Sequence, residues 1–236
     1  MEKVRLDKFL SSSLIISRSD ATEKIKKGLV TVNGSVEKSP NTKINPSSDD
    51  VFLSGSKVNF ADEIYIMLNK PQGLISATSG EDTVLSLFEK SYVDKGLFPC
   101  GRLDKNTTGL LIITTDGPLS HHLLSPKHHA EKIYDVVCDK EFTQKDVELM
   151  QNGIMMDGKM TKPALCVIDE QNKCRATITL TEGKFHQIKR FCYACGQKEV
   201  LSLKRTFFAG LHLDASLSEG QWRHLTQSEI DILKNA

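Results

Sequence analysis

The chain has 236 residues, of which 39% are hydrophobic and 26% charged, and its formal net charge is +1. This is the composition of an ordinary globular protein that stays in water, and no apolar run approaches the roughly 18 to 20 residues that a membrane helix needs. The small net charge argues against a protein that coats nucleic acid over its whole surface, but not against a local basic patch. The first 20 residues lack the apolar core and cleavage site of a secretory signal, so we expect a cytoplasmic protein with no membrane partner.

Residues 1–56 predict a small domain of two helices and a curled sheet. VRLDKFLSSSL has apolar residues at mostly helical spacing, and SRSDATEKIKKG supplies a serine cap, late lysines and a stopping Gly28. LVTVNGSVE then carries Asn33-Gly34, the strongest short hairpin signal, and DDVFLSG supplies a closing strand. The composition changes after this segment, so we place a linker at residues 57–62 and a larger domain at 63–236.

Basic residues are concentrated in this first segment. Residues 1–43 contain nine Lys or Arg and five Asp or Glu, a local excess of four. The order of two helices and a small sheet, with basic residues on the helices, resembles the S4 RNA-binding domain over about residues 3–54. The alternative is an ordinary solvated helix face. The side chains that could line a phosphate backbone, and add affinity without sequence choice, are Arg5, Lys8, Arg18, Lys24, Lys26 and Lys27.

The larger domain is expected to be of the α+β class. Apolar runs and their spacing predict strands at about 64–69, 109–115, 132–138, 164–169, 175–181 and 199–207. Helices are expected near 83–89 and at 118–124, 143–152 and 185–195. A final helix begins at Thr226, because Glu229 three residues later completes a capping box.

The six cysteines are scattered through the chain, which is typical of reduced thiols rather than of a disulfide framework. The pair CYAC at 192–195 has the spacing of a metal or redox site, but no second CxxC accompanies it and it falls in a predicted helix. The adjacent histidines at 121–122 and 128–129 have no carboxylate or cysteine at a characteristic ligand spacing. We therefore expect no metal, and histidines that face solvent or RNA.

The stretch GRLDKNTTGLLIITTDG at 101–117 places Asp104 between a turn and an apolar strand. Such a carboxylate either caps the turn through the amides of Thr107 or Thr108, or is a reactive group anchored by a core strand. Further short polar segments also stand at predicted strand ends. Each has an ordinary structural explanation, but their occurrence together favours a site. They are NKPQG (69–73), EKIY (131–134) and EGKFHQIKR (182–190).

The segments MLNKPQG, GRLDKNTTGLLIITTDG, SPKHHAEKIYDV, TKPA and EGKFHQIKRF, in this order, closely resemble the pseudouridine synthases, in the branch represented by ribosomal small subunit pseudouridine synthase A. With the S4-like segment the resemblance spans nearly the whole chain. It implies a catalytic domain with a mixed, mainly antiparallel sheet flanked by helices. It also implies a cleft in which a uridine in RNA becomes pseudouridine without a metal or an organic cofactor.

The resemblance assigns catalytic roles to three residues. Asp104 matches the catalytic aspartate, and Lys189 matches the cation that pairs with it. Tyr134 matches a tyrosine whose ring stacks on the uracil and whose hydroxyl could carry a proton. Whether Asp104 attacks C1′ or C6 covalently, or removes the 2′ proton to give a glycal, is left open by the sequence.

Four further residues are expected to contact the base or the RNA. Arg102 matches an arginine that helps to hold the strand open, and Leu180 is expected to pack under the base. Lys70 is expected to be a phosphate contact or a structural one. Arg190 is expected to contact RNA, with a solvated helix end as the alternative.

These features predict an enzyme that isomerises one specific uridine of 16S ribosomal RNA, as a monomer acting on a small-subunit assembly intermediate. A 23S-directed synthase of the same branch is the nearest alternative, and we expect such a protein to carry a long basic tail beyond the last helix. A non-catalytic ribosomal RNA-binding assembly factor is a second alternative, against which Asp104, Tyr134 and Lys189 argue. The third is a metal- or thiol-dependent enzyme built on the histidines and CYAC.

Overall fold

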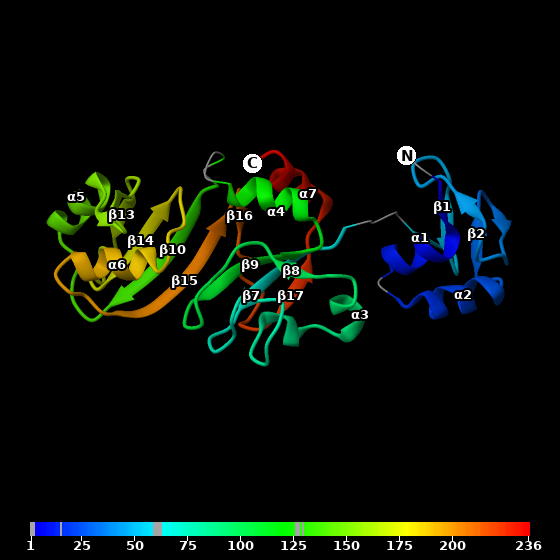
Figure 1. Cartoon of the computed structure of the whole chain (residues 1–236), viewed down its shortest axis with the longest axis horizontal. Helices are drawn as coiled ribbons and strands as arrows, with labels where there is room; N and C mark the ends of the chain where they lie inside the picture. The colour runs from blue at the N-terminus through cyan, green and yellow to red at the C-terminus, as the bar shows by residue number, and fades with distance from the viewer. Residues whose placement is uncertain (1–2, 15, 59–62, 126–127, 129) are drawn as a thin grey trace. The chain divides into compact units, whose positions relative to one another are not determined.

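The computed structural model describes residues 3–14, 16–58, 63–125, 128 and 130–236. Its contacts divide the chain into two compact units, Met1–Ile64 with Phe88–Gly96, and Tyr65–Leu87 with Leu97–Ala236 (Figure 1). Residues 59–62 of the predicted linker lie outside the described residues. Among the described helices, none is long and apolar enough to cross a membrane.

The first unit contains the two predicted helices, α1 (Leu6–Ser13) and α2 (Arg18–Lys26). Ser17 caps α2, because its hydroxyl accepts a hydrogen bond from the amide of Asp20 at 3.0 Å. Gly28, with a φ of +73°, follows the end of the helix. The helices and strands bury a common core that includes Leu6, Phe9, Leu10, Ala21, Ile25, Val30 and Val51.

Short antiparallel strands complete this unit. Asn33 and Gly34 both have a positive φ, as a tight hairpin turn requires, and the predicted hairpin is present. The four-stranded sheet runs in the order β3 (Ser35–Val36), β2 (Val30–Val32), β5 (Val51–Leu53) and β6 (Ser56–Lys57). A separate pair consists of β1 (Val4–Arg5) and β4 (Lys43–Ile44).

The second unit is built on a nine-stranded sheet in the order β13-β14-β10-β15-β9-β7-β17, with β16 on β15 and β8 on β9. β9 and β15 pair in parallel, whereas the other ladders of the described sheet are antiparallel, which confirms the expected mixed, mainly antiparallel arrangement. The strands are β7 (Tyr65–Lys70), β8 (Phe98–Pro99), β9 (Thr108–Thr114), β10 (Lys132–Cys138), β13 (Leu165–Ile168), β14 (Arg175–Leu180), β15 (Val200–Phe208), β16 (Leu211–His212) and β17 (Trp222–His224).

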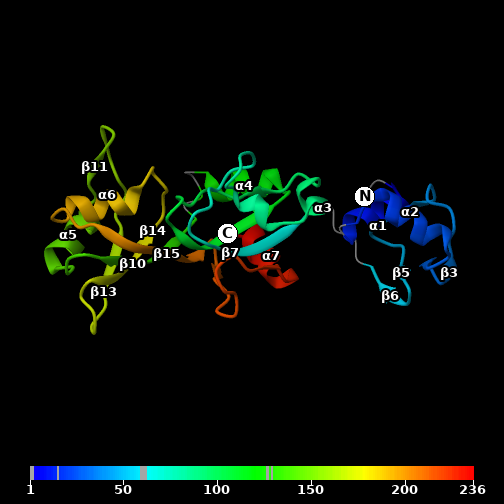
Figure 2. The ribbon, with the colours of Figure 1, turned by 90° about the horizontal axis from the view of Figure 1, so that it is seen from below.

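Two apolar cores lie along this sheet. One packs α5 (Gln144–Asn152) and α6 (Gln187–Ala194) on the strands from β13 to β15, and the other packs α4 (Gly117–Leu124) and α7 (Gln227–Lys234) near β9 and β16 (Figure 1). β10 and β15 pair along their length, and residues of β15 belong to both cores. Figure 2 shows the hairpin of β11 (Met155–Met156) and β12 (Lys159–Met160) projecting from the sheet beside α6.

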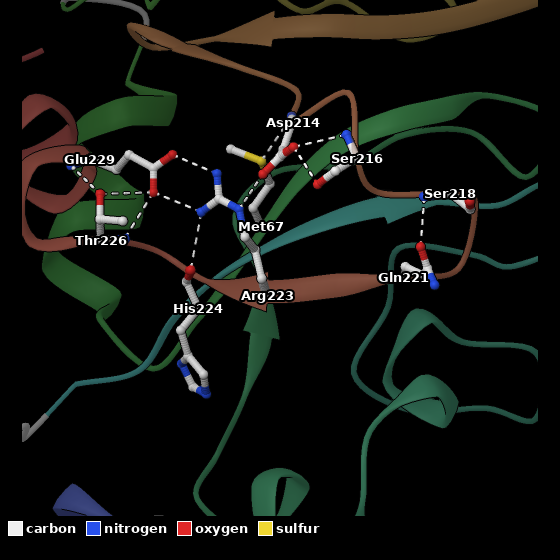
Figure 3. Close-up of polar contacts among 9 residues, drawn as sticks. All are labelled: Met67, Asp214, Ser216, Ser218, Gln221, Arg223, His224, Thr226 and Glu229. Atoms are coloured by element: carbon white, nitrogen blue, oxygen red, sulfur yellow. Dashed lines mark hydrogen bonds and ion pairs between the residues drawn. The ribbon is translucent and has the colours of Figure 1, made fainter.

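Arg223, on β17, joins that strand to α7 and to the loop after β16 (Figure 3). Its Nε donates to Oδ2 of Asp214 at 2.6 Å, and its Nη1 and Nη2 donate to the two carboxylate oxygens of Glu229 at 2.8 Å each. These bonds lower the pKa of Glu229 to about 2, and hydrogen bonds from Ser216 and Arg223 lower that of Asp214 to about 2 as well. Glu229 also completes the predicted capping box with Thr226.

Several segments differ from the sequence prediction, which also did not include the short strands β8, β11, β12 and β16. The helix expected near 83–89 is a 3₁₀ helix, η1 (Val84–Leu87), followed by a short helix α3 (Lys90–Val93). The amide of Ser86 donates to the carbonyl oxygen of Thr83 at 3.1 Å, three residues back, as in a 3₁₀ helix. The amide of Val84 donates to the carbonyl oxygen of Ile75 at 2.9 Å, which ties the start of this segment to a distant residue. The strand β17 was not predicted, because its three residues become a strand by pairing with β7, far away in the sequence.

Candidate active site

Asp104 lies in the loop that leads from β8 into β9. All seven residues of β9 are buried, so the strand is fixed in the core while the loop before it reaches the surface. The amide of Thr107 donates to the main-chain oxygen of Asp104 at 3.0 Å, and this bond closes the turn. The turn thus uses the main chain of Asp104. The carboxylate of Asp104, 28% exposed, faces His186 and Lys189.

Lys70, at the end of β7, supports this loop from inside. Its side chain is fully buried, and its Nζ donates to the carbonyl oxygens of Pro71 at 2.9 Å, Thr107 at 3.0 Å and Lys105 at 3.4 Å. Burial lowers the pKa of Lys70 to about 8, while the negative charge of Asp104 acts in the opposite direction. Of the two roles expected for Lys70, these contacts favour the structural one.

Gly109, the second residue of β9, allows β15 to approach. It pairs with Arg205 across the parallel ladder and has a φ of +101°. A Cβ atom at this position would lie 2.2 Å from the carbonyl oxygen of Arg205, closer than any real contact. Glycine is therefore required both for the backbone conformation and for the space.

The carboxylate of Asp104 meets two cationic or titratable side chains from the start of α6. Nζ of Lys189 lies 3.5 Å from Oδ2, and Nε2 of His186 lies 3.5 Å from Oδ1. His186 is the N-cap of α6 and has the left-handed backbone conformation, with a φ of +50°. This conformation is uncommon for a residue other than glycine and is found at functional sites. The structure thus places Lys189 beside Asp104, as the resemblance implied.

The remaining wall of the site comes from the sheet. Tyr134 on β10 and Arg205 on β15 are neighbours across the ladder, and both line a cavity of about 380 Å³ together with Asp104. The size falls within the range of small-molecule sites. The lining holds five Lys or Arg and a single carboxylate, so the cavity attracts anions such as phosphate. Its charged and polar members include Arg102, Asp104, Lys132, Tyr134, Lys184, His186, Lys189 and Arg205, and Leu180 supplies an apolar surface.

Two cations of this wall, the buried Arg205 and the half-buried Lys132, have defined surroundings. Nε of Arg205 donates to the carbonyl oxygen of Leu110 at 2.7 Å and its guanidinium lies 4.9 Å from the ring centre of Phe208, whereas its buried Nη2 has no hydrogen-bond partner among the described residues. Nζ of Lys132 donates to the carbonyl oxygen of Ala130 at 2.7 Å. Burial, and then the charge of Arg205, lower the pKa of Lys132 to about 8.

The sequence interpretation missed several lining residues, and for different reasons. His186 and Lys132 lie within the segments EGKFHQIKR and EKIY, so the sequence held a signal for both. No local sequence signal indicates Arg205, because its place beside Tyr134 depends on the pairing of β15 with β10.

Other predicted residues lie outside the cavity. Arg190 forms a double hydrogen bond with Asp157, in the turn of the β11–β12 hairpin, at 2.8 and 3.1 Å. The six basic residues of the S4-like segment all lie on the first unit, and two of them are paired. Arg5 donates to Asp7 at 3.0 Å, and Lys27 pairs with Glu23 at 2.5 Å.

Within the part of the chain that the structure describes, no cluster of cysteines, histidines and carboxylates could hold a metal ion. Cys192, on α6, and Cys195, at the end of that helix, are buried in the core, and burial raises the pKa of Cys195 to about 12. A thiol with so high a pKa is a poor nucleophile at neutral pH, which argues against a thiol-dependent enzyme. The rings of His122 and His128 lie 3.7 Å apart, while His129 lies outside the described residues.

Comparisons with known proteins agree with this geometry. The family model described as RNA pseudouridylate synthase matches residues 64–194, and the model of the S4 domain matches residues 4–51. An uncharacterized RNA pseudouridine synthase of Bacillus subtilis is 38% identical, and the alignment covers 98% of this chain and 98% of that protein. Ribosomal small subunit pseudouridine synthase A of Haemophilus influenzae is also 38% identical, with coverage of 98% and 99%. A crystal structure of a pseudouridylate synthase, 36% identical, has a TM-score of 0.69 and coverage of 98% and 99%.

The chain therefore belongs to the RNA pseudouridine synthases, a family of isomerases, and carries an S4 domain in its first unit. Within that family it is similar, over nearly its whole length, to proteins named ribosomal small subunit pseudouridine synthase A. The resemblance seen in the sequence motifs is confirmed.

Proposed function

We propose that the protein converts one uridine of 16S ribosomal RNA to pseudouridine, with Asp104 as the catalytic carboxylate. The observation that carries the assignment is the carboxylate of Asp104, 3.5 Å from Nζ of Lys189, in a cavity that Tyr134 also lines. Relatives that match nearly the whole chain are named for the small ribosomal subunit, which supports the choice of 16S RNA.

The reaction needs a carboxylate but neither oxidant nor water. The N1–C1′ bond breaks, the uracil turns, the C5–C1′ bond forms, the proton of C5 leaves and N1 gains one, so that product and substrate are isomers. Asp104 either bonds covalently to C1′ or C6, or removes the 2′ proton to give a glycal, and then returns to its starting state. The positive charge of Lys189, 3.5 Å away, holds the carboxylate in place.

Neighbouring residues receive the target base. The ring of Tyr134 offers a face on which uracil stacks while it turns, and Leu180 provides the apolar surface beneath it. Arg102 is exposed at the edge of the cavity, where it contacts the RNA from which the uridine has been turned out. Turning a base out of structured RNA costs a few kcal/mol, which such contacts offset.

The basic residues of the S4 domain add phosphate contacts that do not depend on sequence. Lys8, Arg18 and Lys26 are exposed, and none of the three is in an ion pair within the part of the chain that the structure describes. We expect the partner to be a small-subunit assembly intermediate and the enzyme to act as a cytoplasmic monomer.

The test is pseudouridine mapping of ribosomal RNA in cells that lack the protein, rescued with the wild type, with Asp104→Asn or with Asp82→Asn. Asp82 is a matched control, because it is an exposed carboxylate that pairs with Lys105 outside the cavity. One 16S site should disappear and return with the wild type and Asp82→Asn alone. If Asp104→Asn also restores it, the catalytic assignment is wrong. If a 23S site disappears instead, the substrate assignment is wrong, and if no site changes, a non-catalytic role in assembly is favoured.

A further inference from the structure

Phe185 is an exposed aromatic side chain at the cavity that holds Asp104. Its side chain is 65% exposed, although it is one of the residues that line the cavity. Single exposed apolar residues are common on protein surfaces and carry no meaning by themselves. Here, however, the ring lies parallel to that of His186, with 3.8 Å between the ring centres and 18° between the planes. His186 in turn contacts Asp104, so its side chain connects the exposed ring to the carboxylate.

The loop that carries Phe185 is fixed on both sides. The amide of Lys184 donates to Oε1 of Gln187 at 2.9 Å, and Nε2 of Gln187 donates to Glu182 at 2.6 Å. Nζ of Lys184 also donates to the carbonyl oxygens of Lys159 and Met160 in the β11–β12 hairpin, at 3.4 and 3.3 Å. These bonds hold the backbone around Phe185 although its ring stays in solvent. A ring that is ordered before binding loses little entropy when a flat partner covers it.

The surroundings of Phe185 favour a nucleotide as that partner. Arg102, Lys184 and Lys189 line the same cavity, so an anionic backbone is attracted to it. An exposed aromatic ring within such cationic surroundings is how proteins hold single-stranded nucleic acid, because every base has a face on which the ring can stack. Tyr134 also lines this cavity but comes from β10 in the sheet, a different element from the loop that carries Phe185.

We propose that Phe185, supported by His186, is the stacking surface for the base of an unpaired nucleotide adjacent to the uridine in the cavity. The inference rests on the proposed function, since it takes the cavity of Asp104 as the uridine site. It adds a residue that binds RNA without touching the reacting atoms. Because stacking has little preference among bases, Phe185 contributes affinity and the position of the strand, not the choice of sequence.

The test compares Phe185→Ala, Phe185→Trp and Tyr193→Ala in the full chain. Tyr193 is a matched control, since it is also 65% exposed and lies on α6 but does not line the cavity. Kinetics are measured by tritium release from 16S transcript labelled at C5 of uridine. We expect Phe185→Ala to raise KM about tenfold or more with little change in kcat, and Phe185→Trp and Tyr193→Ala to resemble the wild type. An unchanged KM in Phe185→Ala overturns the proposal.

Binding is measured independently of catalysis with a short single-stranded RNA that carries 2-aminopurine on one side of its uridine or on the other. The wild type, Asp104→Asn and Tyr193→Ala should quench the fluorescence of one of these probes, and Phe185→Ala should not. The salt dependence of binding should be the same for Phe185→Ala and the wild type, because stacking releases no counterions. Absence of quenching for both probes with the wild type overturns the proposal.

Failure of this inference is distinguishable from failure of the proposed function. If Asp104→Asn is inactive while Phe185→Ala keeps the KM and the quenching of the wild type, the stacking role is wrong and the catalytic assignment stands. If Asp104→Asn stays active while Phe185→Ala loses quenching, the catalytic assignment is wrong and the base-stacking surface stands. A loss of thermal stability in Phe185→Ala would contradict the exposed, non-structural position of its ring.

Discussion

Nζ of Lys189 lies 3.5 Å from Oδ2 of Asp104, although one residue belongs to a helix and the other to the loop before a strand. The loop is fixed by Lys70 and by the turn bond of Thr107, and the helix is fixed by the buried side chains of Ile188 and Phe191 on its inner face. Two separately anchored elements therefore place the carboxylate and its counter-charge opposite each other.

Lys189→Met should lower kcat by about 10- to 100-fold, because a carboxylate without its counter-charge is no longer held in the reactive geometry, and misplacement by about 1 Å can cost that much. Lys189→Arg keeps the charge and should retain most of the activity. Arg190→Met is the control, since it removes the adjacent cation of α6, which pairs with Asp157. The measurement is tritium release at saturating RNA. Equal losses in Lys189→Met and Arg190→Met would show that the pairing with Asp104 has no special role.

Gly109→Ala should destabilise the second unit by at least about 2 kcal/mol, because a Cβ atom would meet the backbone of Arg205 at 2.2 Å in a conformation with a φ of +101°. The expected fall in Tm is several degrees, measured by thermal unfolding. Gly117→Ala is the control, since Gly117 begins α4 and an added Cβ there meets nothing within 4 Å. A Tm for Gly109→Ala equal to that of the control would contradict the close approach of β9 and β15.

Local sequence patterns were sufficient to predict the elements that carry the site. The strand β9 followed from its continuous apolar run, and the capping box of Thr226 located the start of α7. The motif residues Asp104 and Lys189 were predicted from the resemblance, and the structure places them together.

Features that depend on contacts between distant parts of the chain could not be predicted in this way. Arg205 reaches the site because β15 pairs with β10 and β9 at once, and no local pattern specifies that pairing. The sequence segment EGKFHQIKR indicated His186, but not its contact with Asp104 at 3.5 Å, which joins residues far apart in the sequence. β17 likewise becomes a strand only through its partner β7.

RNA binding should weaken as the pH is raised through about 8, because Lys132 is a cation below that value and neutral above it. Burial lowers the pKa of this lysine, so it loses its charge while exposed lysines keep theirs. Lys132→Arg should keep its affinity up to pH 9.5, and Lys132→Met should show a low affinity that does not change with pH. The measurement is Kd for a uridine-containing RNA at constant ionic strength. A pH dependence that persists in Lys132→Arg would point to Lys70, whose pKa burial also lowers to about 8.

Arg223→Met should lower the stability of the second unit at neutral pH, by about 1–2 kcal/mol for the lost pair with Glu229 after allowance for its partial exposure. The pKa values of Asp214 and Glu229 are both lowered to about 2, so their stabilising effect is complete above their unfolded values near 4 and is lost as the pH falls toward 2. Unfolding in urea between pH 2 and 7 should show this acid-induced loss in the wild type and a flatter curve in Arg223→Met. Arg175→Met, which breaks an exposed pair with Asp135, should keep the slope of the wild type.

Replacing Lys8, Arg18 and Lys26 together with alanine should make RNA binding less sensitive to salt, because each phosphate contact that is lost removes roughly 0.7 to 0.9 from the slope of log K against log salt concentration. The expected reduction is about 2 to 3. Arg5→Ala with Lys27→Ala is the matched control, since both cations already pair with carboxylates of the first unit. Kd for the 16S transcript is measured at salt concentrations from about 50 to 300 mM, where phosphate contacts make a large contribution to binding. An unchanged slope in the triple variant would show that these residues form a solvated face. An equal reduction in the control would show that ion pairing within the first unit does not decide which cations bind RNA.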